Sequence, residues 1–509
     1  MSAANADGAA EGLRRNILTT LLPGFTGPAA PEWLLGLLRE GLGGVCLFGT
    51  NVHTTVQLAE LTATLRGANP LAVVAIDEEG GDVTRLFADR GAPYPGNAVL
   101  GRIDDESLTN AVARAVGEAL AEVGCTLTFA PDADINSNPL NPVIGVRSFG
   151  AAPDLVSRHT AAWIRGVQST GIAASAKHFP GHGDTETDSH LALPVVDLPV
   201  ERLRERELAP FRAAIAAGTR TIMTSHILLP RLDADRPATL SPRILQGLLR
   251  EELGFEGAVV SDALDMAGAS GELGIPEAAV RALIAGCDLL CIGTDNTAAQ
   301  LDDIVAAIED AIDSGRLPAD RVAEAAGRVR ALAIPAPAMP AARGALPSDL
   351  RERIAASFHV APGALERLAG TGRIGTVVRV DTAANIAVGG VPWGPFALLA
   401  APDPARPAPG WLSDAAIVAL DAASPVDDPA GLAGPVLVVG KDLHRHPFAV
   451  AAIERLRAVR RDVVTADLGW PGDDRAFADI ATFGASRAVA EAFAGLVDSA
   501  LRAAPAGVS

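Results

Sequence analysis

Residues 171–190 read GIAASAKHFPGHGDTETDSH, and this stretch indicates how the chain folds. Its first part, 172–176, is an apolar strand-like run that Lys177 and His178 follow directly. The polar segment from Lys177 to His190 has neither helical nor strand periodicity, so we expect a loop that lines a site or coils on the surface. The pattern of a strand followed by ionisable residues recurs along the chain.

Seven further strand-like runs alternate with helical patterns in the first two thirds of the sequence. The eight runs are 17–22, 43–48, 71–76, 125–130, 172–176, 221–225, 257–261 and 287–292. Segments between them, such as 108–124, place apolar residues at three-and-four spacing and end at glycine, as helices do. Alternation of this kind predicts a parallel sheet with crossover helices, and eight units favour a TIM barrel over an open sheet.

Ionisable residues follow five of these runs. Asp77 follows the third run, Asp132 the fourth, Lys177 and His178 the fifth, His226 the sixth and Asp262 the seventh. Each of them alone has an ordinary explanation as a hydrogen-bonding residue at a strand end. Five such positions along one rim indicate an active site, because barrel enzymes place theirs at the carboxyl ends of the strands.

The barrel pattern ends near residue 332, and a second domain follows. Residues 333–349 are rich in proline and alanine and are typical of a linker. Beyond them, the strand-like runs 415–420, 435–440 and 462–469 alternate with helical patterns. The predicted fold is therefore α/β, with an N-terminal TIM-like (β/α)8 barrel over 1–332 and a smaller C-terminal α/β sandwich domain over 350–509.

Composition excludes several classes of protein. The 509 residues hold 61 acidic and 42 basic side chains, an imbalance that repels nucleic acid and anionic membranes. The N-terminus resembles no secretion signal, and no apolar run reaches the ~18 residues of a membrane span. The four cysteines lie in or beside apolar runs and show no zinc-site spacing. We expect a reduced, cytoplasmic protein with no metal or other cofactor.

The end of the opening stretch carries a possible acid/base pair. Asp188 and His190 lie two residues apart, where a carboxylate that accepts from one imidazole nitrogen raises the basicity of the other. Asp262, at the end of the seventh run, is placed as a nucleophile toward the barrel axis. An Asx-type turn with an exposed histidine is the competing interpretation of the pair.

The chain resembles glycoside hydrolase family 3, in its β-N-acetylglucosaminidase branch of NagZ-like enzymes. The family's motifs appear in order as EGGDVTR (79–85), IGVRSFG (144–150), KHFPGHG (177–183) followed by DSH (188–190), and SDALDM (261–266). The linker and second domain resemble the two-domain members. The family's β-glucosidases take a glutamate acid/base from the second domain, whereas the DSH motif places a histidine in the barrel.

The resemblance implies a retaining exo-β-N-acetylglucosaminidase that acts through a covalent glycosyl-enzyme. Asp262 is then the nucleophile and His190 the acid/base, with Asp188 orienting the imidazole. The implied sugar-binding residues are Asp77, Arg85, Arg147, Lys177 and His178, with His226 near the site. The substrate is a β-linked N-acetylglucosaminide, and for cytoplasmic members this usually means muropeptides from cell-wall turnover.

Two alternatives remain open. A neutral imidazole does not repel phosphate as a carboxylate does, so inorganic phosphate could replace water and give GlcNAc-1-phosphate. Because no glycine-rich phosphate cradle lies near the DSH motif, we favour hydrolysis. A catalytically silent sugar-binding protein is the second alternative, and the presence of both Asp262 and His190 argues against it.

Overall fold

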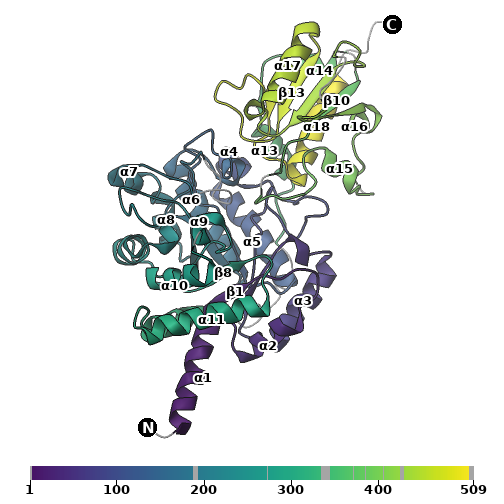
Figure 1. Cartoon of the computed structure of the whole chain (residues 1–509). Helices are drawn as coiled ribbons and strands as arrows, with labels where there is room; N and C mark the ends of the chain where they lie inside the picture. Colours follow the sequence, from purple (N-terminus) through teal and green to yellow (C-terminus); the bar gives the residue numbers. More distant parts are fainter. Residues whose placement is uncertain are drawn as a thin grey trace. The chain divides into compact units, whose positions relative to one another are not determined.

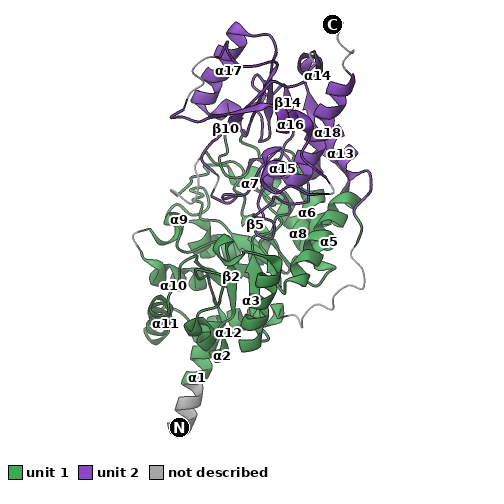
Figure 2. Cartoon of the chain, turned by 90° about the vertical axis from the view of Figure 1, so that its right-hand side faces the viewer, with its two compact units in different colours: residues 1–79, 106–144, 151–345 green, residues 80–105, 145–150, 346–509 purple. Residues whose placement is uncertain are grey.

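The computed structural model describes residues 3–503 except 187–192, 272, 334–343, 371, 385, 405 and 425–428. The chain forms two compact units. Figure 1 colours the chain by residue number, and Figure 2 gives the two units different colours. Unit 1 comprises residues 1–79, 106–144 and 151–345, and unit 2 comprises residues 80–105, 145–150 and 346–509. Among the described helices, none is both long and apolar enough to cross a membrane.

Unit 1 contains parallel strands in the order of the sequence. They are β1 (Leu21–Pro23), β2 (Gly44–Leu47), β3 (Val73–Ile76), β4 (Leu127–Thr128), β5 (Ala173–Phe179), β6 (Thr221–Thr224), β7 (Ala258–Val260) and β8 (Leu290–Gly293). Strands β2 to β7 form one six-stranded sheet, and β1 pairs with β8. A parallel bridge between Val260 and Leu289 links β7 to the residue before β8.

Helices connect these strands and lie outside them in Figure 1. They are α1 (Ala3–Thr19), α2 (Glu32–Glu40), α3 (Thr55–Ala68), α5 (Glu106–Glu122), α6 (Pro153–Gln168), α7 (Val200–Glu205), α8 (Ala209–Ala216), a π-helix (Arg243–Glu252), α9 (Ala267–Ser270), α10 (Ile275–Ala285), α11 (Ala298–Asp313) and α12 (Ala319–Leu332). One apolar cluster takes a side chain from every one of the eight strands, from Leu22 in β1 to Cys291 in β8. This α/β arrangement is consistent with a TIM-like barrel, whose interior is filled by strand side chains.

The strand predictions fail at two places. The first run, 17–22, begins inside α1, and β1 starts only at Leu21. The opening stretch was expected to leave the strand at Lys177, but β5 continues through His178 to Phe179, and all of its residues are buried. Polarity misled the prediction, because the charged side chains at this strand end find buried partners. The four cysteines are buried free thiols, as expected.

Unit 2 is built on a second sheet. Its strands are β9 (His359–Val360), β10 (Thr376–Val380), β11 (Ala416–Leu420), β12 (Val436–Gly440), β13 (Val463–Asp467) and β14 (Ile480–Ala481). They lie in the order β11-β10-β12-β13-β14-β9, and every pair is parallel except β14 with β9. The sequence analysis missed β9, β10 and β14.

Helices cover both faces of this sheet. The helices of unit 2 are α4 (Asn97–Ile103), α13 (Leu350–Ala356), α14 (Ala364–Ala369), α15 (Phe396–Ala400), α16 (Gly410–Asp414), α17 (Pro447–Val459) and α18 (Arg487–Ala503). Alternate residues of β12 enter two separate apolar clusters: Leu437 packs in the cluster that includes α18, and Val438 in the cluster that includes α17. Successive side chains of a strand point to opposite faces, so two helical layers enclose the sheet.

Two segments from the first part of the sequence belong to unit 2. Residues 80–105 bond to the later chain, since the Ala485 amide donates to Asp82 Oδ1 at 2.8 Å and Arg102 Nε donates to the Ser357 carbonyl at 2.7 Å. Each compact unit is therefore built from separate stretches of the sequence, whereas the predicted domains were contiguous. Most of the predicted linker, 334–343, lies outside the described residues, and the predicted domain boundaries stay a prediction.

Candidate active site

Lys177 is held between two carboxylates at the end of β5. Its Nζ lies 2.7 Å from Asp77 Oδ1 and 2.8 Å from Glu79 Oε1, and only 3% of its side chain is exposed. Both partners follow β3, and parallel strands bring their carboxyl ends to one edge. Burying an ammonium is costly unless it is paired and hydrogen-bonded, and here two anions provide the pairing. Asp77 and Lys177 were expected here, whereas Glu79 was quoted only as part of a motif.

His178 is fixed by a carboxylate that the sequence analysis missed. Its Nδ1 lies 2.7 Å from Asp134 Oδ2, and the His182 amide donates to Asp134 Oδ1 at 2.6 Å. Burial raises the pKa of Asp134, but His178, His182 and these hydrogen bonds outweigh it and keep the pKa below its ordinary value. An ionised Asp134 therefore accepts a hydrogen bond from His178 Nδ1 and fixes the orientation of the ring. The signal was the DAD sequence, two residues beyond the predicted Asp132.

Donor atoms of Asp132, Asp134 and His178 lie within 4.8 Å of one another and could surround a metal ion. Within this cluster, Asp132 Oδ1 accepts the Asp134 amide at 3.0 Å, and Asp134 Oδ2 lies 2.7 Å from His178 Nδ1. We assign no metal to this cluster.

His182 is a second histidine of this region that was not singled out from the sequence. It is 1% exposed, and its Nδ1 lies 3.0 Å from Thr185 Oγ1. Burial lowers its pKa to about 4, against the opposing charges of Asp134 and Asp262. The imidazole is therefore neutral at pH 7. Its Nε2 has no hydrogen-bond partner among the described residues.

The segment from Gly181 to Asp184 is anchored to the chain around it. Gly183 packs so closely on the Ile135 carbonyl that a Cβ there would collide with it, and Gly181 has a φ of +125°. Arg206 bridges Asp184 and Glu207. Burial raises the pKa of Glu207 to about 7. These contacts explain why the motif needs its two glycines.

Asp262 follows β7, where the sequence analysis expected it. It is half-buried, and its Oδ1 accepts the Ala263 amide at 2.8 Å. His226 is fully buried, with Nδ1 2.9 Å from Thr239 Oγ1 and Nε2 donating to the Ala263 carbonyl at 2.9 Å. His226 thus contacts the residue next to Asp262 and supports its position. Direct contact between His226 and a sugar stays a prediction.

Four predicted site residues cannot be joined to this cluster. Asp188 and His190 lie outside the described residues. Arg85 and Arg147 belong to the segments of unit 2, where Arg85 Nη2 donates to the Ala387 carbonyl at 2.8 Å and the Arg147 carbonyl accepts from Asn97 Nδ2 at 2.6 Å. Their expected roles stay predictions. The described site therefore consists of Asp77, Glu79, Lys177, His178 with Asp134, His182, and Asp262 with His226.

Comparisons with known proteins identify the family of this chain. Residues 31–332 match the N-terminal domain of glycosyl hydrolase family 3. β-Hexosaminidase A of Pseudoalteromonas piscicida is 36% identical over 328 residues, which are 59% of this chain and 55% of that protein. A β-hexosaminidase of Neisseria meningitidis serogroup C is 38% identical over 264 residues, which are 50% of this chain and 72% of that protein.

A solved structure matches over most of the chain. The glycoside hydrolase family 3 β-N-acetylglucosaminidase from Paenibacillus sp. aligns with a TM-score of 0.83 and 31% identity, covering 96% of this chain and 97% of its own. The resemblance inferred from four motifs is thus confirmed for the family.

Proposed function

The chain belongs to glycosyl hydrolase family 3, and from this premise we propose that it removes terminal β-linked N-acetylglucosamine from glycosides with retention of configuration. The observation that carries the proposal is Lys177, which two carboxylates hold at the strand ends 2.7 and 2.8 Å away. The names of the aligned relatives support N-acetylhexosamine as the sugar. A glycosidase of this kind needs directed donors and acceptors for the sugar hydroxyls.

Lys177 and His178, which carboxylates hold in position, each recognise part of the sugar. The Lys177 ammonium is a donor of charged hydrogen bonds, and at the strand ends it is placed to donate to a sugar hydroxyl. His178 presents Nε2, because Asp134 fixes its Nδ1. Asp77, 23% exposed at its side chain, can accept from a hydroxyl while it binds Lys177. We include Arg85 and Arg147 in the same role from the family resemblance.

The proposed reaction has two displacements. Asp262 attacks the anomeric carbon, the glycosidic C–O bond breaks, and His190 as imidazolium donates its proton to the leaving oxygen. Water then attacks the anomeric carbon while His190 takes a proton from the water. The bond between this carbon and Asp262 breaks. Asp188 orients the His190 ring in both steps. His226 supports this chemistry indirectly, through the Ala263 carbonyl beside Asp262.

The aglycone and the cellular role follow from the resemblance alone. We propose muropeptides of cell-wall turnover, processed in the cytoplasm, as the natural substrates. Chitooligosaccharides and aryl glycosides present the same terminal sugar, so they are suitable test substrates.

The test is hydrolysis of 4-nitrophenyl N-acetyl-β-glucosaminide, followed by proton NMR in the first minutes. The proposal expects β-N-acetylglucosamine to appear first, with the α-anomer growing only by mutarotation. Initial release of the α-anomer would contradict retention, and faster cleavage of 4-nitrophenyl β-glucoside would contradict the assigned sugar. Phosphorus NMR of the same reaction in millimolar phosphate separates hydrolysis from formation of GlcNAc-1-phosphate.

A further inference from the structure

The chain uses lysine at only two positions. Its 42 basic residues include Lys177 and Lys441, and all the others are arginine. Arginine is therefore the usual cation of this sequence, and a lysine differs from it by carrying a compact ammonium in place of a planar guanidinium. Lys177 lies near the carboxyl end of β5, in the candidate active site. Lys441 directly follows β12 in unit 2, at the corresponding end of a parallel strand.

Lys441 stands at a reversal in the strand order of its sheet. Strand β10 lies between β11 and β12, so the chain leaves β10 toward one side of the sheet and returns on the other. In open parallel sheets, ligands bind outside the carboxyl ends of the strands at such a switch point. The two loops that border this crevice start after β10 and after β12.

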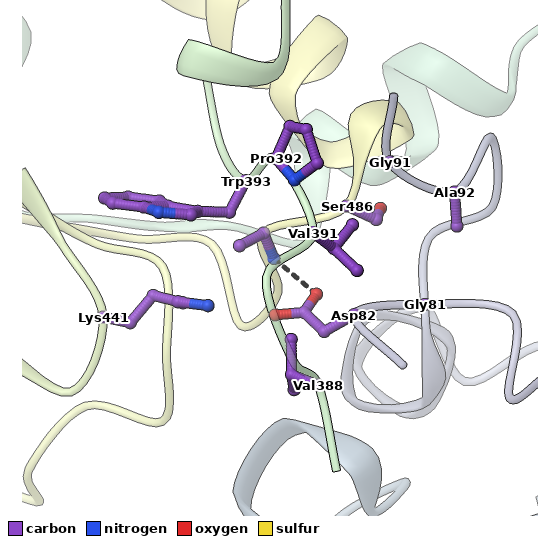
Figure 3. A pocket seen from close by; sticks show the side chains of 11 residues that line it. Gly81, Asp82, Gly91, Ala92, Val388, Val391, Pro392, Trp393, Lys441 and Ser486 are labelled. Atoms are coloured by element: carbon purple, nitrogen blue, oxygen red, sulfur yellow. Dashed lines mark hydrogen bonds between the residues drawn. The ribbon is translucent and has the colours of Figure 1, made fainter. Parts of the chain in front are cut away.

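A small pocket is present at this point (Figure 3). The loop after β10 contributes Trp393, the loop after β12 contributes Lys441, and the segment 80–92 contributes Asp82. Figure 3 shows the Lys441 ammonium directed toward Asp82, with the Trp393 indole beside it. The pocket leaves ≈ 10 Å³ for the centre of a water molecule, which is room for about one water or one hydroxyl group.

The charges that face this pocket do not neutralise each other by direct contact. Among the described residues, no carboxylate lies within 4.0 Å of Lys441 Nζ, although Asp82 interacts with it electrostatically. Asp82 Oδ1 accepts the Ala485 amide at 2.8 Å, which fixes the carboxyl group. Burial raises the pKa of Asp82, against the lowering effect of Lys441. A ligand group that donates a hydrogen bond to Asp82 and accepts one from Lys441 would satisfy both side chains.

Trp393 adds an aromatic wall that is held in place. Its ring packs edge-on against Phe396 at a centroid distance of 5.0 Å, and Lys441 Nζ lies 5.5 Å from its centroid. A hydroxyl group both donates and accepts one hydrogen bond, and the C–H groups of a sugar ring suit contact with an indole. The Lys441 ammonium would repel a metal ion, and the Asp82 carboxylate would repel an anion. Neither therefore fits the pocket as well as a hydroxyl group.

We propose that Asp82, Lys441 and Trp393 form a second saccharide-binding site, carried by unit 2 alone. One hydroxyl of the sugar lies between Asp82 and Lys441, and the ring rests beside Trp393. The choice of an N-acetylglucosamine oligomer as ligand rests on the proposed function, whereas the location of the site rests on the pocket and the strand order.

The two lysines allow a direct test. Protein grown with ¹³Cε-labelled lysine and carrying Asp262→Asn, to prevent turnover, gives one Cε signal for Lys177 and one for Lys441. The variant Lys441→Arg assigns them. Titration with triacetylchitotriose then reports on both places in the intact chain. We expect both signals to shift, and we expect Asp82→Asn to weaken the Lys441 titration about tenfold by removing a charged hydrogen bond, without the same change at Lys177.

The outcomes separate this inference from the proposed function. A Lys177 signal that shifts while the Lys441 signal stays fixed would overturn the second site alone. If the Lys441 signal shifted with the same dissociation constant in wild-type and Asp82→Asn backgrounds, the second site would also be overturned. If neither signal moved at millimolar trisaccharide, both the second site and the sugar assigned to the candidate active site would be wrong. Trp393→Ala, which spares both charged groups, should weaken the Lys441 titration as well.

Discussion

The two lysines of this chain occupy opposite electrostatic situations. Lys177 is 3% exposed and touches two carboxylates, whereas Lys441 is half-buried beside an indole and touches no described carboxylate. Lys177 lies near the carboxyl end of β5 and Lys441 directly follows β12, and α/β proteins bind ligands at this edge of a parallel sheet. The first ammonium is positioned before any substrate arrives. The Lys441 ammonium touches no described carboxylate and can bind a ligand. We therefore expect lysine to serve structure and catalysis in unit 1 and reversible binding in unit 2.

The proposed function places the chemical step in unit 1, at Asp262. The variant with the largest expected loss of turnover tests this assignment. Asp262→Asn should lower turnover of an aryl N-acetylglucosaminide by about four orders of magnitude, because the nucleophile acts in the transition state. Asp265→Asn, three residues away in the same loop, is the matched control and should lose far less. Comparable losses in the two variants would mean that the loop, and not the carboxylate of Asp262, matters.

Lys177→Met should destabilise the fold as well as the site. It removes the buried ammonium that Asp77 and Glu79 contact, and breaking a buried ion pair in this way lowers the unfolding free energy by about 3–5 kcal/mol. Urea denaturation measures this cost. Lys177→Arg keeps the charge and should recover most of the stability but little of the activity. A stable Lys177→Met protein would contradict the idea that the ammonium is structurally fixed.

His182 predicts a pH dependence with a definite sign. Its pKa is about 4 in the folded chain against 6.5 for an ordinary histidine, so the unfolded chain takes up its proton first as the pH falls. Stability should decline between pH 6.5 and 4, by about 3 kcal/mol for the whole shift. The fall should be smaller by this amount in His182→Gln. Parallel stability curves for the two proteins would show that the imidazole does not titrate as described.

The smallest expected effect belongs to Lys441. Lys441→Met removes a cation beside Trp393 and no ion pair within reach, so the unfolding free energy should change by only about 0.5–1 kcal/mol. Measured beside Lys177→Met, this variant sharpens the contrast between the two lysines. A loss as large as that of Lys177→Met would mean that Lys441 is a structural residue, and it would remove the reason to regard it as a binding group.

The sequence patterns predicted the strand-end residues well because charge at the end of an apolar run is a local signal. Lys177, Asp77 and Asp262 were found in this way, and Asp77 proved to bind Lys177 at 2.7 Å. Partners of these groups were missed, since Asp134 lies in the segment after β4 and His178 in β5, and only the fold brings them together. Sequence alone also gives no measure of burial, which makes His182 neutral.

The second unit was harder to predict. Strands β9 and β14 have two residues each, too short to show a period, and β14 pairs with β9 across more than one hundred residues of chain. The inclusion of 80–105 in unit 2 depends on bonds such as that between Asp82 and the Ala485 amide. Contacts between residues so far apart leave no trace in local composition.

The central claim is that Asp262 forms a covalent bond to the sugar. Incubation with a 5-fluoro-N-acetylglucosaminyl fluoride traps such an intermediate, because the fluorine slows its hydrolysis more than its formation. Mass spectrometry of the intact protein, then of its peptides, should find one sugar per chain, on the peptide that contains Asp262, and none in Asp262→Asn. A sugar attached to another residue, or normal turnover of the aryl substrate by protein that never gains an adduct, would contradict the account.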